Sequence, residues 1–177
     1  MGLKSFDIDL LNNVVETNGF KYDGLKMLQL GDQIIRIDGK LRAKKYFEGL
    51  GAFVFSIDIN CKGGSVPIDL AKPVLMPEYN SYFELITNCG TSEHVSDHMQ
   101  CFANMDYFCK KGGIIYNLVP REGFWYNRSH RNVHRYNTDF FASWAANNNY
   151  TILTNRIVTR EEYCSDDLVL AILKKNN

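Results

Sequence analysis

Apolar residues along the chain follow two alternating patterns, short apolar runs and longer stretches with helical spacing. The short runs, which are typical of strands, cover residues 26–30, 52–57, 66–70, 82–87, 114–119, 151–158 and 168–173. The stretches with helical spacing cover residues 6–18, 40–50, 91–108 and 139–147. This alternation predicts a mostly parallel β-sheet of about seven strands that is covered by helices.

Capping and turn residues indicate where these elements begin and end. Ser5 and Gly19 are expected to cap the first helix, and Thr91 with Glu93 to open the third. The run Lys110-Lys111-Gly112-Gly113 is expected to end that third helix in a turn. The last two strands are joined by a loop rather than a helix, so we predict that they pair antiparallel at one edge of the sheet.

Length, charge and cysteine content restrict the class of protein. The 177 residues favour one domain over residues 1–177, in which residues 1–24 form the N-terminal helix and its lead-in. Lys and Arg number 20, as do Asp and Glu, so no net field attracts nucleic acid or anionic lipid. The five cysteines form no C-x-x-C pair, and no apolar leader or membrane-length segment is present. We therefore expect a cytoplasmic protein without membrane contact.

Side chains that can carry chemistry gather at or shortly after the ends of the predicted strands, where open parallel sheets bind their ligands. The candidates that share this placement are Gln29, Gly31, Asp32, Gln33, Asp58, Ile59, Asp69, Leu70, Asn88, Glu93 and His94. In this order, from about Leu28 to Leu173, the motifs resemble those of class I S-adenosylmethionine-dependent methyltransferases. The resemblance depends on the ordered series, because each motif alone is weak.

The resemblance implies a fold and a cofactor. The fold is a Rossmann-like three-layer sandwich with a mostly parallel, seven-stranded sheet in the order 3-2-1-4-5-7-6, including an antiparallel edge strand. The cofactor is S-adenosylmethionine, and its methionine part is expected near the loop after the first strand. Only Gly31 matches the customary glycines of that loop, while Gln29 replaces a carboxylate and Gln33 replaces a glycine. The amides of Gln29 and Gln33 can still hydrogen-bond the ammonium or carboxylate.

The resemblance also assigns the adenosine part of the cofactor. Asp58 is expected to accept hydrogen bonds from both ribose hydroxyls, and Ile59 to lie against the adenine ring. Asp69 is expected to accept from the adenine amino group, with Leu70 supplying a backbone contact. Asn88 is placed where a polar side chain could face the methyl group.

Methyl transfer from a sulfonium requires alignment of the donor and the acceptor and exclusion of water. A base helps the acceptor to lose a proton, and histidine suits this role near neutral pH. We take His94 as the candidate base and Glu93 as its neighbour. The alternative is that Glu93 only caps a helix and His94 only packs over the cofactor. The spacing of His94 with His98, and of His130 with His134, is compatible with metal ligation, but two ligands are not a site and we expect no metal.

A cationic and aromatic segment follows the fifth apolar strand of the resembled core. Within residues 121–137 we take Trp125, His130, His134 and Tyr136 as candidate substrate-binding residues that cover the acceptor pocket. The same composition fits a single-stranded nucleic-acid contact, or a rim loop whose aromatic rings only cover the core.

Three functions remain open on this evidence. The first is methyl transfer to a small-molecule acceptor. The second is a non-catalytic binding or regulatory protein with the same fold, which the departures at Gln29 and Gln33 motivate. The third, less favoured, is a nucleic-acid methyltransferase. Because so little of the chain lies outside the core, a homodimer or a partner subunit could complete the acceptor pocket.

Overall fold

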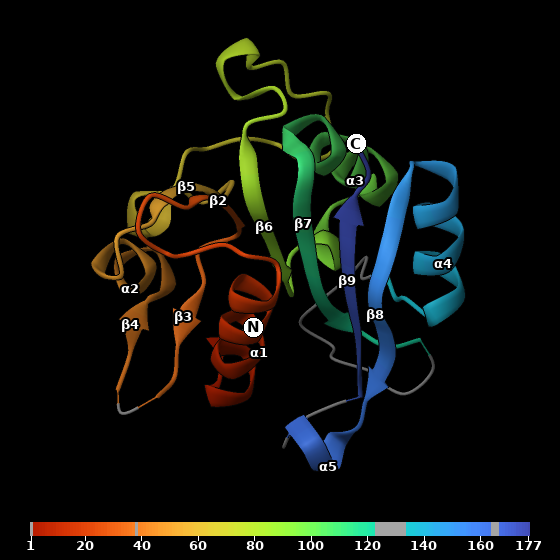
Figure 1. Ribbon diagram of the computed structural model, residues 1–177, viewed down its shortest axis with the longest axis horizontal. Coiled ribbons are helices and arrows are strands. Elements are labelled where there is room, and N and C mark those ends of the chain that lie inside the picture. Colours follow the sequence, from red (N-terminus) through yellow and green to blue (C-terminus); the bar gives the residue numbers. More distant parts are fainter. Residues whose placement is uncertain (1, 38, 123–133, 164–166) are drawn as a thin grey trace.

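The computed structural model describes residues 2–37, 39–122, 134–163 and 167–177. Within these residues the main sheet has six strands in the order β5-β2-β6-β7-β9-β8 (Figure 1). They are β2 Lys26–Leu30, β5 Phe53–Ile57, β6 Phe83–Cys89, β7 Cys109–Pro120, β8 Tyr150–Val158 and β9 Leu168–Lys175. Strands β5, β2, β6 and β7 pair in parallel, whereas β9 pairs antiparallel with β7 and β8. The predicted Rossmann-like strand order 3-2-1-4-5-7-6 is confirmed, except that the strand predicted third along the chain is missing from the edge beside β5.

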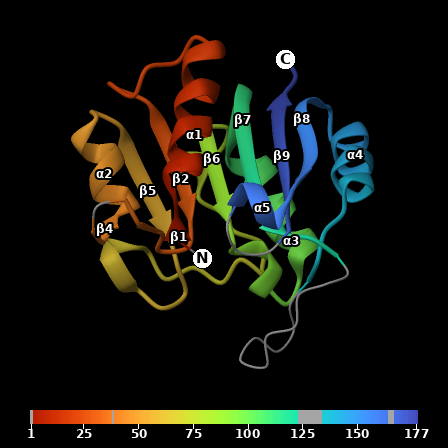
Figure 2. The same cartoon turned by 90° about the horizontal axis from the view of Figure 1, so that it is seen from below.

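The helices cover both faces of this sheet. They are α1 Ser5–Thr17, α2 Ala43–Gly49, α3 His98–Phe108, α4 Thr138–Asn147 and the short α5 Arg160–Tyr163. One apolar core lies between the sheet and α1 and α2, and it contains Leu11 and Phe47. The other lies between the sheet and α3 and α4, and it contains Phe102 and Trp144. Figure 2 shows α1 in front of the sheet and α3 behind it.

The strand predicted at residues 66–70 is not formed. Val66 makes one isolated parallel bridge with Ile57, and the chain then leaves the edge of β5. Pro67 follows directly, and proline has no backbone N–H with which to continue a ladder. Ile68 and Leu70 instead turn toward the carboxyl ends of the strands. The prediction was wrong because an apolar alternation does not show whether the backbone can pair.

Two predicted helices are shorter than their apolar patterns. The stretch 40–50 begins as strand β4 Leu41–Arg42, which pairs with β3 Ile34–Ile35, so α2 starts only at Ala43. The stretch 91–108 divides into the 3₁₀ turn η3 Ser92–His94 and α3. Asp97 separates these two elements, because its side chain accepts a hydrogen bond from the Gln100 N–H at 2.9 Å and caps α3.

Two local sequence signals, a predicted turn and a predicted helix cap, have a different role in the structure. The lysine and glycine run at residues 110–113 lies inside β7 as an irregularity in its pairing with β6, and Gly112 has a φ of 76° there. At α1 the N-cap is Lys4 rather than Ser5, and the Asp7 carboxylate accepts from the Lys4 N–H at 2.7 Å. The start of the chain is fixed beside the first strand loop, because β1 Gly2–Leu3 pairs in parallel with β3.

A buried amide network joins the carboxyl ends of the central strands. Asn88 on β6 donates to the Asn117 side chain on β7 at 3.0 Å and to the Ser92 hydroxyl at 2.8 Å. Its own Oδ1 accepts from the Ser92 N–H at 3.0 Å. Asn117 in turn donates to the Ala171 carbonyl of β9, and the Tyr136 hydroxyl donates to Ser92. The network fixes η3, and with it Glu93 and His94, against three strands.

We expect Asn88→Ala to lower the free energy of unfolding by about 2–4 kcal/mol, because buried partners on Ser92 and Asn117 lose their hydrogen bonds. Urea denaturation followed by circular dichroism measures this change. The matched control is Asn147→Ala at the exposed end of α4, for which we expect a change below about 0.5 kcal/mol. Equal losses in both variants would contradict the structural role assigned to the network.

Candidate functional site

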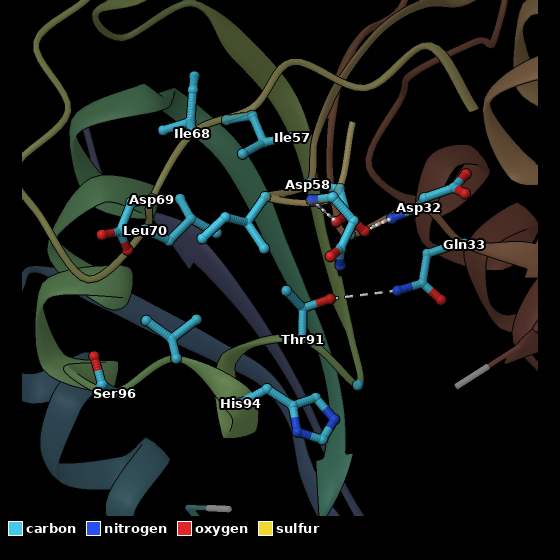
Figure 3. A pocket seen from close by; sticks show the side chains of 15 residues that line it. Asp32, Gln33, Ile57, Asp58, Ile68, Asp69, Leu70, Thr91, His94 and Ser96 are labelled. Atoms are coloured by element: carbon cyan, nitrogen blue, oxygen red, sulfur yellow. Dashed lines mark hydrogen bonds between the residues drawn. The ribbon is translucent and has the colours of Figure 1, made fainter. Parts of the chain in front are cut away.

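A cavity of about 480 Å³ opens at the carboxyl ends of β2, β5 and β6 (Figure 3). This is where the strand order reverses, because the chain continues from β2 toward β5 on one side and from β6 toward β7 on the other. The predicted residues that line the cavity are Gly31, Asp32, Gln33, Asp58, Ile59, Asp69, Leu70 and His94. Eight candidates from four separate sequence motifs therefore meet at one cavity.

Gly31 forms the tight turn at the end of β2. Its φ is 76°, and a Cβ at this position would lie 2.5 Å from the Thr91 Oγ1. Thr91 follows β6 and donates to the Leu30 carbonyl at 2.9 Å, which holds the two strand ends together. A side chain at Gly31 is therefore excluded both by the backbone conformation and by the close approach of Thr91.

The two glutamines of the first motif are oriented by backbone carbonyls. Gln29 is buried, does not line the cavity, and donates from Nε2 to the Gly31 carbonyl at 2.7 Å. Gln33 donates from Nε2 to the Cys89 carbonyl at 2.7 Å and also contacts Thr91 at 3.4 Å. The Gln33 side chain thus links the ends of β2 and β6 at the place where a customary glycine would leave space.

Asp58 is held by the loop that follows the first strand. Its Oδ2 accepts from the Asp32 N–H and its Oδ1 accepts from the Asn60 N–H, both at 2.8 Å. Each carboxylate oxygen has a second lone pair, so the group can still accept two further hydrogen bonds. The backbone therefore fixes the orientation of this carboxylate at the cavity before any ligand binds.

Asp32 combines two roles in the same loop. Its N–H binds Asp58, and its carboxylate forms an ion pair with Arg42 at the start of α2. A Cβ on Gly63 would clash with the Asp32 carboxylate, so this glycine allows the close approach. The arrangement anchors the loop to α2 and neutralises the Asp32 charge.

The opposite side of the cavity is mostly apolar. Ile59, Ile68 and Leu70 line it, and Ile59 is 67% exposed. Asp69 accepts from the Ala71 N–H at 3.0 Å and pairs with Lys72 at 3.4 Å. Figure 3 shows Asp58 and Asp69 on opposite sides of the lining. The spacing between the two acids leaves an apolar surface on which a planar ring can lie.

Glu93 and His94 lie in η3, next to the cavity. His94 lines the cavity, and its Nε2 is 3.7 Å from the Glu93 Oε1. Glu93 does not line it and is 3% exposed, and its burial raises the pKa of the carboxyl to about 7. A buried carboxyl thus stands behind an imidazole that faces the cavity.

The remaining candidates lie elsewhere or outside the described residues. Asn88 belongs to the buried amide network and does not line the cavity. Tyr136 is buried behind Ser92, and its hydroxyl donates to that residue at 3.0 Å. Trp125 and His130 fall outside the described residues.

His94 and His98 do not have the helical geometry that their spacing allows, and His130 of the other pair lies outside the described residues. His94 is in η3 and His98 begins α3, so the two do not share a helix. His98 instead lies against His134, with 4.0 Å between ring centroids. The His134 Nε2 is 3.2 Å from the Ser96 carbonyl, and the His134 backbone N–H donates to the Glu93 carbonyl at 2.8 Å. His134 thus contacts the cavity rim through Ser96 but does not line the cavity.

Several residues of the site were not found in the sequence as site residues. Thr91 was interpreted only as a helix cap, although its position directly after the Gly90 turn is a usable signal. Ser96 and Arg42 have no such signal, because their positions depend on the break before α3 and on the β3–β4 pairing. Asn60 carries the same signal as Asp58, since both follow β5 in one turn.

In the part of the chain that the structure describes, no three His, Cys, Asp or Glu side chains converge as a metal site would require. No described helix is long and apolar enough to cross a membrane.

Comparison with known proteins gives similarity in structure but not in sequence. No protein-family profile matches the chain, and no curated protein matches it. The 1,6-didemethyltoxoflavin-N1-methyltransferase of Burkholderia thailandensis, solved with S-adenosylhomocysteine, superposes with a TM-score of 0.67 at 14% identity, covering 94% of this chain and 76% of that one.

Two further solved structures show how widely this fold is used. The [4+2]-cyclase SpnF superposes with a TM-score of 0.62 at 12% identity, covering 95% of this chain and 80% of that one. An N-methyltransferase of Haemonchus contortus, bound to phosphomonomethylethanolamine and S-adenosylhomocysteine, superposes with a TM-score of 0.60 at 11% identity. The superposition covers 96% of this chain and 53% of that one. The chain therefore has the Rossmann-like fold of class I S-adenosylmethionine-dependent methyltransferases.

Proposed function

We propose that this protein binds S-adenosylmethionine in the described cavity and transfers its methyl group to a small-molecule acceptor. The observation that carries the proposal is the convergence of Gly31, Asp58 and His94, from three separate motifs, on one cavity at the switch point of the sheet. Solved neighbours of this fold hold S-adenosylhomocysteine, which supports the choice of cofactor.

The side chains of the cavity fit the adenosine part of this cofactor. Asp58 keeps two lone pairs for ribose hydroxyls, because only one lone pair on each oxygen is used by a backbone N–H. Ile59 and Leu70 offer an apolar surface for the adenine ring. Asp69 is the candidate acceptor for the adenine amino group, although its carboxylate also serves Ala71 and Lys72.

The methionine part belongs at the Gly31 turn, between the ends of β2 and β6. Gly31 lets the ligand approach the backbone closely, and Gln33 supplies a side chain at the same end of the cavity. Asp32 supports the turn through Arg42 and Asp58 rather than through a free carboxylate. When bound, the cofactor supplies an electrophilic methyl group on a positively charged sulfur.

The chain's own task is to position the acceptor and to accept its proton. His94 lines the cavity and can take a proton from an acceptor held against the methyl group. Glu93 stands 3.7 Å behind it, where a carboxylate favours the protonated imidazole. The buried amide network keeps η3 in place, so both side chains approach the cavity in a fixed geometry.

A second candidate function is binding of the same cofactor without turnover. The Gln33 side chain favours it, because this amide bridges β2 and β6 where the customary glycine leaves open space. Binding measurements and transfer measurements separate the two functions, since a regulator would bind the cofactor and show no transfer to any acceptor.

We expect Asp58→Ala to abolish S-adenosylmethionine binding that is measurable in the wild type by isothermal titration calorimetry. The loss follows because Asp58 is the lining carboxylate that two backbone N–H groups orient while leaving lone pairs for the ribose hydroxyls. The matched control is Asp9→Ala on the exposed face of α1, for which affinity should remain within about twofold. Unchanged affinity of Asp58→Ala for S-adenosylmethionine would show that the cofactor does not bind in this cavity.

We expect His94→Gln to reduce methyl transfer by about 10²–10⁴-fold, as removal of a general base does, while cofactor affinity changes little. Transfer is measured with S-adenosylmethionine labelled in the methyl group and a metabolite mixture as the source of acceptor. His98→Gln is the control, because His98 lies against His134 and does not line the cavity. If the two variants lose equal activity, His94 is only a packing residue.

A further inference from the structure

One side of the cavity is formed by a loop that belongs to no strand. The loop comprises residues 67–75, and we call it the 67–75 loop. Its residues Asp69 and Leu70 line the cavity, on the side opposite Asp32 (Figure 3). Strand pairing ends just before the loop, at the isolated bridge made by Val66. The position of Asp69 at the cavity therefore depends on contacts other than a β-ladder.

The sequence of this loop prevents it from pairing as a strand. Pro67 and Pro73 lie within it. Proline has no backbone N–H, and it restricts the backbone of the residue before it. Two N–H groups are used inside the loop, because those of Ala71 and Lys72 both donate to Asp69. The contacts that fix the loop to the rest of the protein must come from another element.

Asn104 of α3 supplies these contacts. Its Nδ2 donates to the Leu70 carbonyl at 3.1 Å and to the Lys72 carbonyl at 2.9 Å. Its Oδ1 accepts from the Val74 N–H at 3.1 Å and from the Gln100 Nε2 at 3.1 Å. Among the described residues, every hydrogen bond that joins the 67–75 loop to another part of the chain is made by Asn104.

The amide of Asn104 is fully used by this arrangement. A side-chain amide offers two N–H donors and two acceptor lone pairs, and all four are engaged. The orientation of the amide is fixed, because its Nδ2 faces two carbonyls and a carbonyl can only accept. Asn104 is 2% exposed, and hydrogen bonds at a buried site are costly to lose. The amide therefore sets the path of the loop backbone.

Apolar packing also holds the loop, but it does not set the direction of Asp69. The side chains of Leu70 and Val74 are buried in the core between the sheet and α3. Burial of apolar surface is non-directional, so it tolerates a rotated backbone. The Asp69 carboxylate accepts from the Ala71 N–H and pairs with Lys72, and both partners lie within the loop. The direction of this carboxylate therefore follows the loop backbone that Asn104 holds.

Asn104 also determines which backbone group of Leu70 remains available. The Leu70 carbonyl accepts from Asn104, whereas the Leu70 N–H has no partner among the described residues. An N–H donor next to the Asp69 acceptor matches adenine, in which ring N1 accepts and the 6-amino group donates. A 6-oxo purine has the reverse pattern, because its oxo group accepts and its N1–H donates. The loop in this conformation therefore favours a 6-amino purine.

We propose that Asn104 is a positioning residue for the cofactor, which acts through the 67–75 loop to hold Asp69 and Leu70 where they recognise the adenine base. This inference rests on the proposed S-adenosylmethionine site. Asn104 does not itself line the cavity. Its side chain takes the place of the ladder that a third strand would have formed at this edge of the sheet.

The test compares S-adenosylhomocysteine with S-inosylhomocysteine, in which an oxo group replaces the 6-amino group of the base. Isothermal titration calorimetry on the full chain gives both affinities. We expect the wild type to prefer S-adenosylhomocysteine at least about tenfold, because the oxo group would face the Asp69 carboxylate.

Two substitutions at Asn104 should remove this preference. Asn104→Asp keeps an acceptor for the Val74 N–H but cannot donate to the two carbonyls as a carboxylate. Asn104→Ala removes all four hydrogen bonds. In both variants we expect affinity for S-adenosylhomocysteine to fall about tenfold or more, and the preference over S-inosylhomocysteine to fall to about threefold or less.

Two control variants separate positioning from a general loss of stability. Phe141→Leu in α4 removes buried volume from the same apolar core, yet it should keep the preference of the wild type. Gln100→Ala removes only the Asn104 contact that does not reach the loop, and it should also keep the preference. An equal loss of preference in Phe141→Leu and in the Asn104 variants would overturn the proposal.

A measurement on the wild type decides the question if the Asn104 variants do not fold. Hydrogen exchange followed by NMR reports on the Val74 N–H, which Asn104 binds. Without ligand, we expect this N–H to exchange at least about 100-fold more slowly than in an unstructured peptide. Exchange at the peptide rate would show that Asn104 does not hold the loop before the cofactor binds.

The outcomes distinguish failure of this inference from failure of the proposed function. If the wild type binds neither S-adenosylmethionine nor S-adenosylhomocysteine, the proposed function is wrong and this inference falls with it. If the wild type binds both and the Asn104 variants keep the full preference for adenine, the cofactor site stands and the positioning role is wrong. Equal affinity of the wild type for the adenosyl and inosyl compounds would likewise refute recognition of the base by this loop.

Discussion

The close approach of two strand ends at Gly31 is the constraint on which the site depends. Strands β2 and β6 are neighbours in the sheet, and the connections that leave them diverge to opposite sides. Thr91 and Gln33 hold these ends together through the carbonyls of Leu30 and Cys89, and only glycine fits between them. Because the strand ends are joined but their continuations diverge, a cavity forms beyond the joint. Asp58 then acquires its orientation from the Asp32 N–H of the same turn.

The order of the apolar runs was sufficient to predict a mostly parallel sheet between layers of helices, because each run must bury one face. The strand order was predicted from the resemblance to class I methyltransferases. The apolar pattern was not sufficient to predict the third strand. Residues 66–70 have the composition of a strand, yet Pro67 cannot donate to a ladder and Ile68 turns to the cavity. Likewise, the break before α3 depends on Asp97 and on the Asn88 network, and neither is visible as a pattern of apolar positions.

The site itself could be predicted where a residue follows a strand directly. Gly31 and Asp58 meet at the cavity because carboxyl ends of parallel strands share one edge, and His94 joins them from η3 in the connection after β6. Asn88 also lies at the carboxyl end of its strand, but its side chain is buried and donates a hydrogen bond to the Asn117 side chain on the neighbouring strand. One residue of shift along a strand reverses the face, so position alone does not separate a ligand contact from a buried brace. The role of Arg42 could not be predicted for another reason, because the position of this residue depends on the pairing of β3 with β4.

The distribution of unpaired charge connects the fold with the kind of ligand it can hold. Burying a carboxylate without a cation is costly, so most buried or half-buried acids of the described chain have Lys or Arg partners. Asp58 is held by backbone N–H groups instead, and Asp7 and Glu93 each keep an open oxygen. Of these three acids, Asp58 lines the cavity, whereas Asp7 in α1 and Glu93 in η3 are buried and do not line it. At Asp58 a ligand that brings hydroxyl donors can use the lone pairs that remain, because each carboxylate oxygen accepts from only one backbone N–H.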